Sequence, residues 1–99
     1  MQTLINEVIK WGYDKGIINQ ATEVGQADKT LEEAQELKDA IVNGGEYWGI
    51  VDGIGDTMVT LILQAEMQDL KIEQCLEYAL EQIQGRKGQI INGQFVKEE

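Results

Sequence analysis

Apolar residues recur at helical spacing along most of the chain, in four stretches separated by glycine-rich or polar breaks. The clearest break is Asn43-Gly44-Gly45, which is typical of a left-handed helix cap followed by a turn. Gly12 and Gly16 bracket the end of the first stretch. The pattern therefore predicts an all-α fold of four helices. The predicted helices span residues 2–15, 21–42, 46–67 and 71–84.

The third predicted helix is apolar nearly all round after Asp56. Such a helix is expected to be buried on several sides, so we predict a four-helix bundle that is completed by oligomerisation. Beyond the fourth helix, Asn92-Gly93 separates two short apolar runs, which predicts either a small hairpin or an extended arm. No linker composition divides the chain, and residues 1–99 are expected to form a single domain.

Composition excludes several kinds of chemistry. The chain has no Ser, Pro or His, which removes Ser-His-Asp catalysis and His-based zinc sites. Cys75 is the single cysteine; it rules out an internal disulfide, and its spacing predicts a place in the core. The net charge of −10 argues against a nucleic-acid surface. With no apolar run long enough to span a bilayer, we expect a soluble, cytoplasmic protein that does not bind membranes.

Acidic side chains line one face of the second predicted helix. Gln26, Lys29, Glu33 and Glu36 step by 3, 4 and 3 residues, which places them on one stripe. A neighbouring apolar stripe is expected to form a buried seam beside the acids. That stripe consists of Ala27, Leu31, Ala34 and Ile41.

Asp52 and Asp56 lie four residues apart within the apolar third helix, so they share a face. If the two helices pack antiparallel, the carboxylate pairs meet in an oxygen-rich cage suited to Mg²⁺ or Mn²⁺. Two alternatives stay open. Glu32, Glu33 and Glu36 also fit an ordinary solvated helix face, and Asp52 also fits the acid preference of a helix N-terminus.

Three segments together resemble the MazG-like, all-α NTP pyrophosphohydrolase family, in particular its short, phage-type members. The first is the K-x-x-E-E-x-x-E-L pattern of residues 29–37, the second is Ile54-Gly55-Asp56, and the third is the tail of residues 85–97. The similarity covers nearly the whole chain. One position departs from it: the Glu-x-x-Asp motif of the family would place a glutamate where this chain has Gly53, and Asp52 is one residue earlier.

The resemblance implies Mg²⁺-dependent hydrolysis of a nucleoside triphosphate to the monophosphate and pyrophosphate, a reaction that cleans the nucleotide pool. It also implies a homodimer or homotetramer. The metal ligands would be Glu33, Glu36, Asp52 and Asp56. Glu32 and Glu33 are the candidates for positioning or activating the attacking water.

Other residues are candidates for substrate contact. Lys29 would bind phosphate, and Arg86 and Lys87, the densest positive charge in the chain, are candidates for the same role or for solvated cations at a helix C-terminus. Gln26 and Trp11 are candidates for the base, although Trp11 also fits a core or subunit contact.

Two rival functions remain open at this point. One is a non-catalytic module, either an acidic helical oligomer or a nucleotide binder that lost turnover through Gly53. The other is a pyrophosphatase of the same all-α group restricted to dUTP or dCTP. Base preference depends on pocket shape, which residue spacing alone does not specify.

Overall fold

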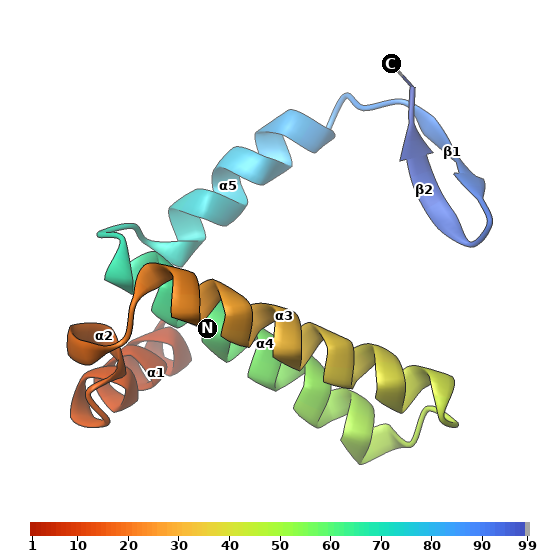
Figure 1. Ribbon diagram of the computed structural model, residues 1–99. Coiled ribbons are helices and arrows are strands. Elements are labelled where there is room, and N and C mark those ends of the chain that lie inside the picture. Colours follow the sequence, from red (N-terminus) through yellow and green to blue (C-terminus); the bar gives the residue numbers. More distant parts are fainter. Residues whose placement is uncertain (99) are drawn as a thin grey trace.

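Helices account for most of the chain in the computed structural model, which describes residues 1–98 (Figure 1). They begin and end close to the predicted boundaries, and a short helix α2 forms between the first and second predicted helices. The elements are α1 (Gln2–Asp14), α2 (Ile17–Gln20), α3 (Glu23–Val42), α4 (Tyr47–Met67), α5 (Ile72–Ile83), β1 (Gly88–Ile91) and β2 (Gln94–Lys97).

Local chemistry explains where these helices begin and end. The Thr22 hydroxyl accepts a hydrogen bond from the Gly25 backbone N–H at 2.9 Å, so α3 starts at Glu23, two residues later than predicted. At its other end, Gly44 and Gly45 adopt positive φ values of 121° and 67°. Glycine adopts this backbone without a Cβ penalty, and the chain reverses there into α4.

Helices α3 and α4 form an antiparallel hairpin that makes up the body of the molecule (Figure 1). Gly53 lies at their contact: a Cβ there would be 2.9 Å from Leu37 Cδ1 and 3.1 Å from Leu37 Cα. At Gly12 of α1 a Cβ would be 2.5 Å from Leu63 Cδ2, the end of a side chain of α4. Glycine at position 53 allows α3 and α4 to approach each other more closely than a larger residue would permit.

The hydrophobic core is small. Its buried apolar members, Ile5, Ile62, Leu63 and Ala65, come from α1 and the second half of α4. Within the single chain α4 is not buried on several sides, because Ile54, Met58 and Leu61 are 48%, 42% and 43% exposed. Its burial against another subunit stays a prediction.

Two predictions about the core are wrong. The apolar stripe that contains Leu31 and Ile41 faces outward, and the stripe of α3 that faces α4 is the more polar one. This inner stripe consists of Gln26, Thr30, Glu33, Leu37 and Ala40. Cys75 is exposed, because α5 leaves the body instead of closing a four-helix bundle around it.

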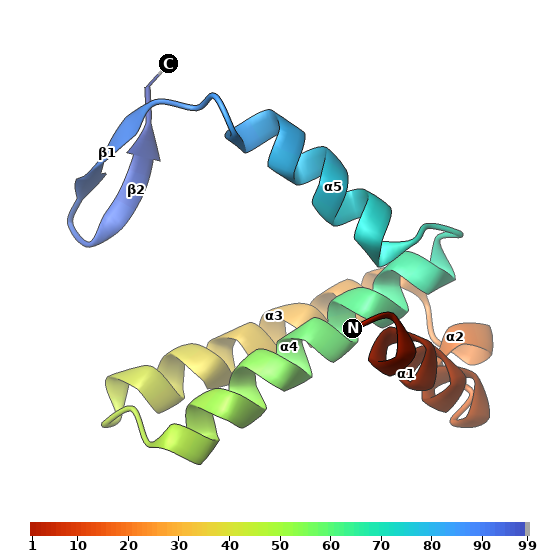
Figure 2. The same ribbon diagram turned by 180° about the vertical axis from the view of Figure 1, so that it is seen from behind.

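The C-terminal part projects from the body. Helix α5 contacts α4 near the turn that joins them and then carries the two-stranded hairpin away from α3 and α4 (Figures 1 and 2). Asn92 and Gly93 both have positive φ, the geometry of a two-residue hairpin turn, so the hairpin alternative is confirmed. No helix in residues 1–98 combines the length and the apolar character that crossing a membrane requires.

The extended shape leaves much surface exposed. The solvent-accessible area is 7750 Å², whereas a compact chain of 11.1 kDa is expected to expose about 5,700 Å². The radius of gyration is 15.6 Å, against about 12.6 Å for a compact domain of this length. The chain therefore has about 2,100 Å² more exposed surface than a compact monomer would have.

Candidate functional site

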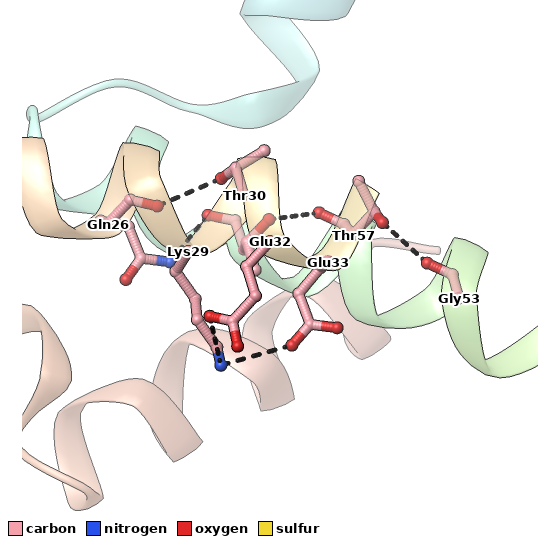
Figure 3. Close-up of polar contacts among 8 residues, drawn as sticks. Gln26, Lys29, Thr30, Glu32, Glu33, Gly53 and Thr57 are labelled. Carbon is pink, nitrogen blue, oxygen red and sulfur yellow. Dashed lines mark hydrogen bonds and ion pairs between the residues drawn. The ribbon is translucent and has the colours of Figure 1, made fainter. Parts of the chain in front are cut away.

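The acid stripe of α3 is organised around Lys29. Its Nζ lies 3.2 Å from Glu32 Oε2 and 3.5 Å from Glu33 Oε1, so one cation contacts two carboxylates (Figure 3). The two acids differ in exposure: the Glu33 side chain is 13% exposed and the Glu32 side chain 57%. Glu33 belongs to the α3 stripe that faces α4, which explains its partial burial.

Glu36 lies one turn further along α3. Hydrogen bonding to Glu33, followed by charge repulsion from Glu33, raises the pKa of the Glu36 carboxyl above its usual value of 4.5. Lys29 acts in the opposite direction. The neighbouring Glu33 therefore makes the negative charge of Glu36 less favourable than that of an isolated carboxylate.

A cavity of about 240 Å³ opens next to this stripe, between α1, α2, α3 and α4. It brings together five residues that the sequence singled out on three different helices. They are Trp11 from α1, Gln26, Lys29 and Glu33 from α3, and Asp56 from α4. The antiparallel packing of α3 and α4 thus places a carboxylate of each helix on the wall of one cavity.

A hydrogen bond joins α3 to α4 at the cavity wall, and two more stabilise the wall within α4. Gln26 is buried, and its Nε2 donates to the Thr60 carbonyl oxygen at 3.1 Å. The Thr60 hydroxyl in turn donates to the Thr57 carbonyl oxygen at 2.6 Å. The Thr57 hydroxyl donates to the Gly53 carbonyl oxygen at 2.7 Å (Figure 3). Gln26 therefore has a structural role in joining α3 to α4, in addition to its place on the cavity wall.

Several predicted site residues lie outside the cavity. Glu32, Glu36 and Asp52 are exposed and do not line it. Arg86 and Lys87 follow α5, on the segment that projects away from α3 and α4 (Figure 2). Within residues 1–98, His, Cys, Asp and Glu side chains do not form a group of three or more that could hold a metal ion. The complete four-carboxylate cage is therefore not assembled in the single chain.

Gly53 does not face the cavity. It packs against Leu37 of α3, where even a Cβ is too close to the neighbouring backbone. A glutamate at this position would disrupt the α3–α4 contact, so Gly53 is explained by packing in this chain.

Sequence reasoning missed four residues of the cavity wall: Ile17, Val59, Thr60 and Leu63. Thr60 had a usable signal, because it is four residues after Asp56 and is polar within an apolar run. Ile17 had none, since the contact of α2 with α4 depends on the left-handed Gly16 that turns the chain.

We compared the chain with protein-family models, curated proteins and solved structures, and none of them matches it.

Proposed function

We propose that the protein is a Mg²⁺-dependent nucleoside triphosphate pyrophosphohydrolase that acts as a homodimer or homotetramer. One observation carries the proposal: Glu33 of α3 and Asp56 of α4 line one cavity together with Lys29 and Trp11. Carboxylates can bind the metal ion, a cation can contact the triphosphate, and an aromatic ring can stack on the base.

The donor set suits a hard divalent cation, because the candidate ligands are carboxylate oxygens: Glu33, Glu36, Asp56 and Asp52. The repulsion between Glu33 and Glu36 supports cation binding at this point, since a bound cation would relieve it. Mn²⁺ could replace Mg²⁺ with the same ligand type. When bound, the cation supplies charge neutralisation for the phosphates and a more acidic water.

The residues of the chain divide the remaining work. Lys29, now paired with Glu32 and Glu33, would exchange one of these partners for a substrate phosphate. Glu32 or Glu33 would accept a proton from the water as its oxygen attacks the α-phosphorus. The bond from that phosphorus to the bridging oxygen then breaks, and pyrophosphate leaves with the bond electrons.

The base would lie against Trp11, a residue that is 45% exposed and lines the cavity. Gln26 lies on the same wall, but the bond of its amide nitrogen to Thr60 limits its movement. The same geometry is compatible with hydrolysis of many nucleoside triphosphates and with hydrolysis restricted to dUTP or dCTP.

Oligomerisation is part of the proposal, because the chain exposes about 2,100 Å² more than a compact monomer, and a stable dimer interface needs about 800 Å² from each partner. An apolar groove of about 350 Å³ between α1, α4 and α5 supports this. It is lined by Met58, Ile62, Leu76 and Leu80, among others, and offers a face on which a second copy can pack.

The alternative function is a non-catalytic acidic module. Lys29 already neutralises part of the acid stripe, and residues 1–98 hold no group of three acids positioned for a metal ion. Both observations agree with a protein that binds no metal ion.

The deciding experiment measures pyrophosphate release from a panel of NTPs and dNTPs, with and without Mg²⁺. We expect Asp56→Asn and Glu33→Gln to lower turnover by at least about 100-fold, as loss of a metal ligand should. Asp28→Asn, an exposed acid on the same α3 helix, is the matched control and should retain turnover. If no substrate turns over and Mg²⁺ leaves the melting temperature unchanged, the non-catalytic alternative replaces the proposal.

A further inference from the structure

The C-terminal arm, defined here as residues 85–98, does not pack against another element of the described chain. Every residue of its two strands is exposed, and each strand is only four residues long. Ile90 and Phe95 form a cross-strand pair, and the Phe95 ring lies over Gly88, where a Cβ would be 2.5 Å from it. An isolated two-stranded hairpin is marginally stable in water, so this apolar pair is expected to pack against another surface.

The arm also differs from the rest of the chain in charge. It carries three cations and one anion, a net charge of +2, which the following Glu99 in the sequence reduces to +1. Residues 1–84 carry five cations and sixteen anions, a net charge of −11. The arm is therefore electrostatically complementary to the body from which it projects.

A groove on the body matches the arm in character. It lies between α1 and α4 and has a volume of about 370 Å³. Its wall is apolar apart from two carboxylates, those of Glu7 and Asp56. Its residues are Leu4, Glu7, Val8, Trp11, Asp56 and Val59, of which Trp11, Asp56 and Val59 also line the candidate cavity.

The arm and the groove of one chain are kept apart by α5, which leads away from α1, α3 and α4 (Figures 1 and 2). A second copy has no such restriction, and the excess exposed area of about 2,100 Å² per chain is more than a standard interface needs. We propose that the arm of one copy docks in the α1–α4 groove of a second copy.

Docking in this groove would bring Arg86 and Lys87 of the arm next to Asp56 and the mouth of the candidate cavity of the second copy. The substrate phosphates would then meet Lys29 from one copy and these two cations from the other. This consequence rests on the proposed function, whereas the docking itself does not. Each site is thereby completed by two copies of the chain.

The first test needs no enzymatic activity. Val8→Cys and Ile90→Cys are placed on separate chains of different mass, both in a Cys75→Ala background, and the two chains are co-expressed and oxidised. A disulfide between the two chains is expected, because residue 8 lines the groove and residue 90 lies on the arm. Lys38→Cys, on an exposed part of α3, replaces Val8→Cys in the control and should give little cross-linking.

Cross-linking equal to that of the control, or a monomer in light scattering, would overturn the docking whatever the activity of the protein. A signal confined to the Val8–Ile90 combination supports it. High salt present before oxidation should reduce the yield, because it screens the attraction between the arm and the body.

The second test measures whether the cations act on the other copy. Chains carrying Asp56→Asn are mixed with chains carrying Arg86→Ala and Lys87→Ala, each inactive alone. About a quarter of wild-type turnover should return, because random assortment makes half of the dimers mixed and one site in each is intact. Activity of the Arg86→Ala and Lys87→Ala chain alone, or no recovery despite cross-linking, would overturn the role of the two cations while leaving the docking in place.

Discussion

Helices α4 and α5 both carry apolar residues at helical spacing, yet within residues 1–98 α4 buries apolar side chains in the core with α1, whereas α5 buries none. Leu63 of α4 is 2% exposed, whereas Leu76 of α5 is 71% exposed. The close contact at Gly53 and the Gln26 bond to Thr60 hold α3 against α4. Beyond its first turn, α5 has no comparable contact.

Apolar periodicity therefore indicates that a helix face will be buried, but it does not indicate which element will cover that face. For α3 and α4, the turn at Gly44-Gly45 brings the two helices together at once. For α5, the turn around Asp69, a residue with φ of 62°, directs the helix away from the body. The apolar face of α5 therefore remains available to a second chain.

The largest expected effect comes from the same substitution in the two regions. Leu63→Ala should lower the free energy of unfolding by about 2–5 kcal/mol, because it removes buried contacts and leaves a cavity. Leu76→Ala should change the stability of the single chain by about 0.5 kcal/mol or less. Urea unfolding of both variants measures the contrast.

The Leu76 variant also tests association. If α5 packs on a second copy, the melting temperature of the Leu76→Ala variant should depend on protein concentration differently from that of the wild type. Equal losses for the two variants at every concentration would remove the distinction between the regions.

Two glycines of α4 test how closely α3 and α4 approach each other. Gly53→Ala should destabilise the protein by about 1–3 kcal/mol, because the new Cβ meets Leu37. Gly55→Ala should stabilise it by up to about 1 kcal/mol, since a Cβ there has open space and alanine favours the helix. Thermal unfolding checks both; a stabilising Gly53→Ala would mean that α3 and α4 are further apart than described.

The smallest effect concerns pH. The folded state keeps the Glu36 proton to a higher pH than the unfolded state, because the pKa of Glu36 is raised by Glu33. The wild type should therefore lose stability as the pH rises through and above the usual value of 4.5. Glu36→Gln should match the wild type below that pH and be slightly more stable at pH 7.

The same unfolding experiment can be repeated in the presence of Mg²⁺. If the carboxylates bind the cation, Mg²⁺ should raise the melting temperature of the wild type at pH 7 more than that of Glu36→Gln, and the advantage should disappear at pH 4, where protons compete for Glu36. An identical response of the two proteins would remove Glu36 from the ligand set.

Local residue patterns specify where the helices form and which side chains share a helix face. Gly44-Gly45 and Asn92-Gly93 mark reversals through their positive-φ backbone, which is a local property, and both are found where the sequence indicated them. The helical spacing of Gln26, Lys29 and Glu33 is likewise local, and it places them on one side of α3 beside the cavity.

Only the tertiary structure decided which apolar stripe faces inward and which residues meet. α3 has two candidate stripes, and the close approach at Gly53 selects the more polar one, so the Glu33 side chain becomes largely buried while Leu31 faces outward. Cys75 follows the same rule, because its exposure depends on the direction of α5. The physical reason is that side-chain spacing specifies a face of a helix, whereas the neighbour of that face depends on contacts between residues distant in the chain.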